Sequence, residues 1–135
     1  MASRNPDDLH PYLKKLWEDH QKRFEELMPG CQLFLTCTYR SNEEQAALYA
    51  QGRTKPGPIV TKALPGQSYH NHKPALAYDV AVLVNGKLDW NTKGEAWKAI
   101  KKTGITCGLE GLSFELAHFQ LPQAVLKTLG IKFPK

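Results

Sequence analysis

The sequence predicts an α+β fold, in which helices pack on one side of an antiparallel sheet of about four strands. Two segments rich in β-forming residues, 31–39 and 76–84, indicate the sheet, and an Asn-Gly pair at 85–86 indicates a hairpin after the second of them. Apolar residues at helical spacing before residue 29 indicate the first helix. With 135 residues, 41% of them hydrophobic, we expect a single domain over 1–135.

The first helix is predicted from Pro6 to Met28. Pro6 and the aspartates that follow it are typical of a helix N-terminus, and Pro29-Gly30 ends the apolar pattern. His10 and His20 lie among charged residues of this segment. We therefore place both histidines on the solvent-exposed surface.

The strand over 31–39 is followed directly by a helix signal. Ser41 and Glu44 form a capping box, which predicts a short helix from Glu43 to Gln51. Because side chains alternate along a strand, Cys31 and Cys37 should face the same side of it. An odd number of cysteines does not suit a disulfide scaffold, so we expect reduced thiols.

The remaining elements are predicted from turn and capping signals. Residues 52–67 are rich in proline and glycine and form a loop of a length that is often functional. Later elements are a return strand over 87–90, a helix from about Lys93 to Thr103 with a capping box at Thr92 and Glu95 and an end at Gly104, a strand over 114–121, and a helix over 123–129.

Charge and hydropathy exclude several classes of function. The net charge of +5 suits an anionic partner, but the basic residues are scattered, so we expect no nucleic acid. No apolar run is long enough for a membrane span, and the N-terminus lacks the apolar core of a secretory signal. We therefore expect synthesis in a cytoplasm.

Chemistry-bearing residues gather in two stretches. The first holds His70 and Asp79, and the second holds Glu115 and His118. Zinc in hydrolases usually takes three protein ligands and leaves one position for water, and a further carboxylate can accept the proton of that water. These four residues supply such a set. Their spacing alone also allows structural roles, such as a loop histidine, a salt-bridged aspartate and a core histidine.

The spacing between Glu115 and His118 makes a structural prediction. Residues three apart in a regular strand face opposite sides of the sheet. For both side chains to reach one site, the strand must be irregular at Leu116-Ala117, or Glu115 must lie on the preceding loop.

These motifs resemble a known enzyme family. Ser68-x-His70, Ala77-x-Asp79 and Glu115-x-x-His118 are similar to the zinc D-alanyl-D-alanine carboxypeptidase and L-alanyl-D-glutamate endopeptidase family, which shares its fold with the Hedgehog signalling domain. The similarity covers roughly residues 30–121. Three more stretches resemble the phage endolysin branch: Tyr39-Arg40-Ser41, Gly52-Arg53-Thr54 and Asn85–Trp90.

The resemblance implies one Zn²⁺ per chain, in a cleft on the side of the sheet opposite the helices. By position, His70, Asp79 and His118 would be the metal ligands, and Glu115 would be the catalytic base. Arg40 would bind substrate or stabilise the oxyanion, because its charge is fixed. Ser68 would either bind near the substrate or support the His70 loop. Gln45 would contact either the substrate or the loop.

The sequence departs from the family pattern in the spacer before Asp79. This spacer, residues 71–78, is longer than is usual, and the usual spacing would select His72 as the first ligand. The block Ser68-Tyr69-His70-Asn71 favours His70, which leaves His72 as a rim residue or substrate contact. The connection over 109–114 is also shorter than in many relatives.

From this resemblance we expect a monomeric, endolysin-like zinc peptidase without a separate wall-binding domain, which cleaves peptidoglycan stem peptides at the L-Ala–D-Glu bond. A D-Ala–D-Ala carboxypeptidase or dipeptidase is the alternative within the family. A non-catalytic zinc-containing binding module and a cysteine hydrolase using Cys37 or Cys107 are alternatives outside it. Without a signal, a phage lysis protein would leave the host cytoplasm through a separate partner and degrade the cell wall from the periplasm.

Overall fold

The computed structural model describes residues 2–113 and 115–134 and confirms the α+β class. Phe114, where the last predicted strand begins, lies outside the described residues. In chain order the elements are η1 (Pro6–Asp8), α1 (Pro11–Leu27), β1 (Cys31–Cys37), α2 (Asn42–Ala50), η2 (Tyr69–Asn71), β2 (Ala77–Val84), β3 (Lys87–Leu88), α3 (Glu95–Thr106), β4 (Glu110–Gly111), β5 (His118–Gln120) and α4 (Gln123–Thr128).

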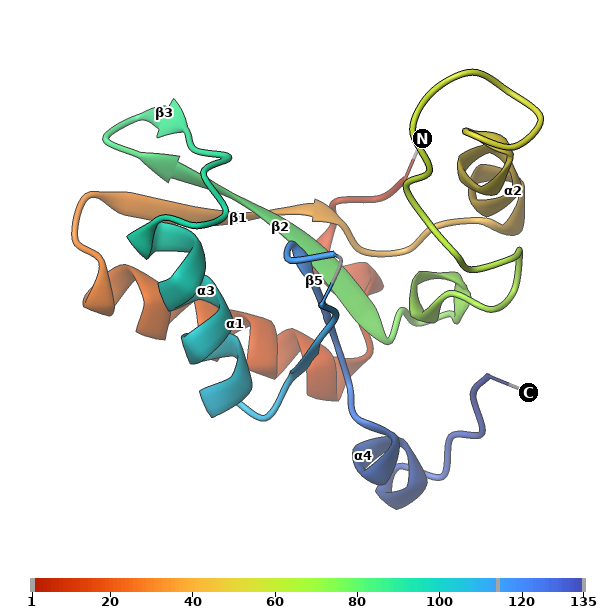
Figure 1. Cartoon of the computed structure of the whole chain (residues 1–135). Coiled ribbons are helices and arrows are strands. Elements are labelled where there is room, and N and C mark those ends of the chain that lie inside the picture. Colours follow the sequence, from red (N-terminus) through yellow and green to blue (C-terminus); the bar gives the residue numbers. More distant parts are fainter. Residues whose placement is uncertain (1, 114, 135) are drawn as a thin grey trace.

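The sheet has five antiparallel strands within the described residues, in the order β1-β2-β5-β4, with β3 paired to β2. Helices α1 and α3 lie together on one side of it, while α2 and the loop over 52–67 lie at one end (Figure 1). The core between sheet and helices holds Leu33 and Val82 from the strands and Leu13 and Ile100 from the helices. Within the described part of the chain, no helix is long and apolar enough to cross a lipid bilayer.

Two local turn signals form as predicted. Asn85 and Gly86 both have positive φ, 53° and 81°, and this backbone conformation joins β2 to β3 in a tight hairpin. Ser41 and Glu44 form both hydrogen bonds of the capping box at the start of α2.

Three predicted helix boundaries are wrong. The sequence predicts that the first helix begins at Pro6, but Pro6–Asp8 forms the separate 3₁₀ element η1 and α1 begins at Pro11. Helix α3 begins at Glu95 after Gly94, and no side chain caps it, so the capping box predicted at Thr92 does not form. Gly104 lies inside α3 rather than at its end. A Cβ atom at Gly104 would lie 2.5 Å from a ring carbon of Phe119, so close packing explains the glycine there.

The prediction of a surface His20 is also wrong. His20 is fully buried on the inner side of α1, where Nε2 lies 2.8 Å from the Ile100 carbonyl oxygen and Nδ1 lies 2.6 Å from the Tyr78 hydroxyl. A carbonyl oxygen only accepts hydrogen bonds, so Nε2 carries the proton and Nδ1 accepts from the hydroxyl of Tyr78. The buried pair therefore holds a neutral imidazole.

Acid should destabilise the fold through His20. Burial lowers the pKa of His20 to about 4, whereas the unfolded chain takes up this proton near pH 6.5. The free energy of unfolding should therefore fall as the pH drops between these values, by up to about 3 kcal/mol from this residue. Denaturant titrations between about pH 7 and pH 4.5 would measure the decrease. In His20→Gln the free energy of unfolding should fall less over this pH range, because the contribution of His20 is missing. An equal decrease in the wild type and in His20→Gln would show that His20 does not cause it.

A β-bulge in β1 changes which side of the sheet Cys37 faces. Leu35 pairs with Val80 on the core side, but Cys37 pairs with Asp79, because Thr36 is an extra residue between the two pairs. Cys31 and Cys37 therefore face opposite sides, contrary to the prediction from simple alternation. The bulge brings Cys37 into the row that Asp79 forms with His118 across the sheet.

Candidate metal centre and cleft

Three predicted site residues converge at the end of the sheet. Asp79 on β2 lies directly opposite His118 on β5, and His70 reaches the same place from the short turn η2. His70 Nε2 lies 3.0 Å from Asp79 Oδ1 and 3.2 Å from His118 Nδ1. Asp79 Oδ1 and His118 Nδ1 are 3.1 Å apart. The structure thus forms a compact triangle of two imidazole nitrogens and one carboxylate oxygen.

The orientation of His70 is set by its outer nitrogen. His70 Nδ1 lies 2.8 Å from the Thr38 carbonyl oxygen, which only accepts, so Nδ1 carries a proton and donates it. Ser68 caps the turn, and its hydroxyl accepts a hydrogen bond from the His70 backbone N–H. Nε2 is thereby aimed into the triangle, and Ser68 supports the His70 turn.

The orientation of His118 is set through two further residues. The Gln120 amide nitrogen donates to the Glu110 carboxylate, so the Gln120 oxygen faces His118 Nε2 at 2.8 Å. An amide oxygen only accepts, so His118 Nε2 carries the proton and Nδ1 faces the triangle. Outer-shell bonds of this kind are typical of metal-binding histidines.

The triangle is also a strongly coupled group of charges. Burial opposes the charged form of His70, yet the adjacent Asp79 carboxylate raises the pKa of His70 to about 10. Burial likewise opposes ionisation of Asp79, but His70 and His118 hold the pKa of this carboxyl well below its usual range. A metal ion bound to His70 Nε2 would therefore have to displace a proton.

Glu115 lies on the loop just before β5, as one of the two predicted arrangements requires. The strand begins at His118, whose backbone N–H donates to the Glu115 carbonyl oxygen across a tight turn. The Glu115 carboxylate is 3.9 Å from His118 Nδ1, and burial raises its pKa. The turn thus brings both side chains to one site despite their spacing in the sequence.

The Arg40 side chain contacts the other carboxylate oxygen of Asp79, Oδ2, and is mostly buried. Its guanidinium donates to Gln45 Oε1 at 2.9 Å and to Asp79 Oδ2 at 3.5 Å. The amide nitrogen of buried Gln45 donates to Thr61 and Ala63 in the loop over 52–67. Gln45 therefore links Arg40 to this loop.

A cleft of about 560 Å³ opens onto the triangle. Six of the predicted site residues line it: Arg40, Ser68, His70, Asp79, Glu115 and His118. Gln45 and His72 are not among the residues that line it. His72 Nδ1 instead lies 2.9 Å from the Pro74 carbonyl oxygen, and its ring packs against Phe133.

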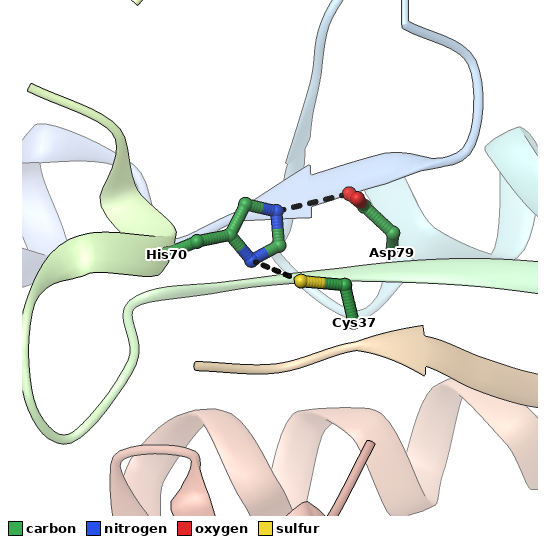
Figure 2. Close-up of side chains that lie close together, drawn as sticks. All are labelled: Cys37, His70 and Asp79. Atoms are coloured by element: carbon green, nitrogen blue, oxygen red, sulfur yellow. Dashed lines mark hydrogen bonds and ion pairs between the residues drawn. The ribbon is translucent and has the colours of Figure 1, made fainter. Parts of the chain in front are cut away.

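Cys37, His70 and Asp79 form a second combination of residues that could hold a metal ion, with donor atoms within 4.8 Å of one another. Figure 2 shows Asp79 and Cys37 at opposite nitrogens of the His70 ring. Cys37 Sγ lies 3.6 Å from Nδ1, the nitrogen that donates to Thr38. Arg40 Nη2 is 3.5 Å from both Sγ and Asp79 Oδ2, so its positive charge disfavours a cation between them.

Sequence reasoning named Ser68 as a support of the His70 loop but missed the other residues that orient the two histidines: Thr38, Gln120 and Glu110. Gln120 follows His118 by two positions on a strand, and this spacing places both side chains on one face and could have indicated the contact. Thr38 acts through its backbone, and Glu110 arrives by pairing of β4 with β5. Neither contact leaves a local signal in the sequence.

Comparisons with known proteins support the resemblance seen in the motifs. No protein-family model matches the chain. The peptidoglycan L-alanyl-D-glutamate endopeptidase CwlK of Bacillus subtilis (strain 168) is 34% identical to it over 111 residues, which cover 78% of this chain. The match spans 65% of the length of CwlK.

A solved structure shows the same fold. The L-Ala D-Glu endopeptidase ChiX of Serratia marcescens matches with a TM-score of 0.61 and 15% identity, over 93% of this chain and 91% of ChiX. At this identity the likeness concerns the fold. The chain thus has the fold of ChiX and is similar in sequence, over most of its length, to the L-alanyl-D-glutamate endopeptidase CwlK.

Proposed function

We propose that the chain is a zinc-dependent peptidoglycan endopeptidase that cleaves the L-Ala–D-Glu bond of stem peptides. His70, Asp79 and His118 would hold one zinc ion, Glu115 would act as the base and Arg40 would contact the substrate. The triangle of inward-facing donor atoms at 3.0–3.2 Å is the observation that carries this proposal. The similarity to CwlK supports the choice of substrate.

The donor set fits zinc in number, type and spacing. Zinc–ligand distances of about 2.0–2.1 Å in a tetrahedron correspond to donor–donor distances of about 3.3 Å. The outward nitrogens of His70 and His118 each donate a hydrogen bond, so each histidine offers one lone pair to the centre. Three protein ligands leave one position open on the cleft side, which is typical of catalytic rather than structural zinc.

When bound, zinc would supply Lewis-acid polarisation of the peptide carbonyl and would lower the pKa of water. Glu115 lines the cleft beside His118, and its carboxylate can accept a proton from the attacking water and deliver it to the leaving amine. Burial raises the pKa of Glu115, and this favours both halves of that transfer. Arg40, fixed by Gln45, would place a permanent positive charge beside the developing oxyanion.

Mass spectrometry of digested peptidoglycan tests the function. Purified peptidoglycan incubated with the protein should release stem peptides with a new N-terminal D-Glu, and 1,10-phenanthroline should stop this release. Loss of terminal D-Ala alone would instead indicate a carboxypeptidase. Intact muropeptides in a zinc-loaded sample would contradict the peptidase and favour a binding module.

A further inference from the structure

The turn that carries His70 is held on its inner side by Arg40. The Arg40 backbone N–H donates to the His70 carbonyl oxygen at 2.9 Å, and the Asn71 side chain donates to the Arg40 carbonyl oxygen at 2.8 Å. Asn71 Oδ1 also accepts from the backbone N–H of Ser68. These bonds fix the turn against the end of β1.

The outer side of the same turn is covered by the C-terminal segment. In Figure 1 this segment runs back from α4 towards the turn that precedes β2. The Phe133 ring makes edge contacts with Tyr69 and with His72, in each case with ring centroids 5.4 Å apart. Phe133 is 9% exposed, so its own ring is buried by this packing, while Tyr69 and His72 stay partly exposed.

A single side chain ties the segment and the turn together. The Gln123 amide nitrogen, at the start of α4, lies 2.6 Å from the Phe133 carbonyl oxygen and also donates to the Tyr69 hydroxyl. Phe133 therefore contacts residues on both sides of the His70-Asn71 pair, and Gln123 fixes Phe133 against one of them.

We propose that Phe133 and Gln123 form a C-terminal clamp that positions His70 for metal binding. This inference rests on the proposed function, in which His70 is a ligand. The turn η2 is only three residues long, so its placement depends on contacts from other segments in addition to its own capping bonds between Ser68 and Asn71. Small displacements of a ligand are costly because outer-shell support sets both metal affinity and rate. The clamp residues do not line the cleft, so they act through the turn and not on the substrate.

Zinc affinity measured by competition with a chromophoric chelator tests the clamp. Phe133→Ala should bind zinc about tenfold more weakly than wild type, within the range typical of outer-shell changes. Gln123→Ala should show the same direction, and because Gln123 is exposed this variant should fold normally. Phe133→Leu, which keeps apolar packing, should recover part of the affinity.

Leu129→Ala is the matched control. Leu129 packs against the core from the same C-terminal segment, but no described contact joins it to the His70 turn. It should lower thermal stability without lowering zinc affinity. Wild-type affinity in both Phe133→Ala and Gln123→Ala would overturn the clamp, whereas failure of the wild type itself to bind zinc would overturn the proposed function.

Discussion

Glu115→Gln is expected to reduce cleavage of peptidoglycan by about 10²–10⁴-fold while zinc stays bound. The amide keeps the size of the side chain but cannot accept a proton from water. The three donor atoms of the triangle lie on other residues, so the proposed metal site should be unchanged in this variant. Release of stem peptides, followed by mass spectrometry, and zinc content, measured on the same sample, would give the two readouts.

Glu95→Gln is the matched control for this variant. Glu95 begins α3 and is exposed, so the same chemical change there should leave cleavage at the wild-type rate. Wild-type cleavage by Glu115→Gln would show that another group accepts the proton. Loss of zinc from Glu115→Gln would assign Glu115 to the metal instead.

Most of the sheet could be predicted because its signals are local, whereas the residues of the triangle were selected because their motifs resemble those of a known family. The Asn85-Gly86 turn needs positive φ at both positions, and few other sequences provide it. The irregular entry to β5 followed from the requirement that Glu115 and His118 reach one site, and the structure confirms it. The need to bring both side chains to one site predicted the backbone at residues 115–118 better than the strand propensity of this segment did.

The β-bulge in β1 and the burial of His20 could not be predicted, because both depend on contacts between segments that are distant in the sequence. The bulge at Thr36 moves Cys37 to the cleft side, yet nothing in 31–37 distinguishes this strand from a regular one. His20 lies among charged residues, but its partners Tyr78 and Ile100 come from other elements. A buried polar side chain is recognised only when its partners are known.

His70→Ala is expected to lower zinc affinity by more than the 10–100-fold that is typical of outer-shell changes, and to abolish cleavage. His72→Ala removes a ring contact with Phe133 but no donor atom of the triangle, so it should keep cleavage and lower zinc affinity by no more than the roughly tenfold expected of Phe133→Ala. The reason is geometric: His70 Nε2 faces the other two donors, whereas His72 Nδ1 faces the Pro74 carbonyl oxygen. Zinc competition titrations and digestion assays on both variants would compare the two histidines directly.

The comparison of His70→Ala with His72→Ala needs a second ligand variant, because replacing the buried His70 can affect folding as well as zinc binding. His70 is 1% exposed, so thermal unfolding of His70→Ala should be checked, and His118→Ala provides a second ligand variant on a different element. If both lose zinc while His72→Ala retains it, the longer spacer before Asp79 is accommodated by the turn over 70–76, which the Leu76 N–H closes on the Tyr69 carbonyl oxygen. If His72→Ala loses zinc and His70→Ala keeps it, the turn must rearrange on metal binding, because the Phe133 contact would have to open for His72 to reach Asp79.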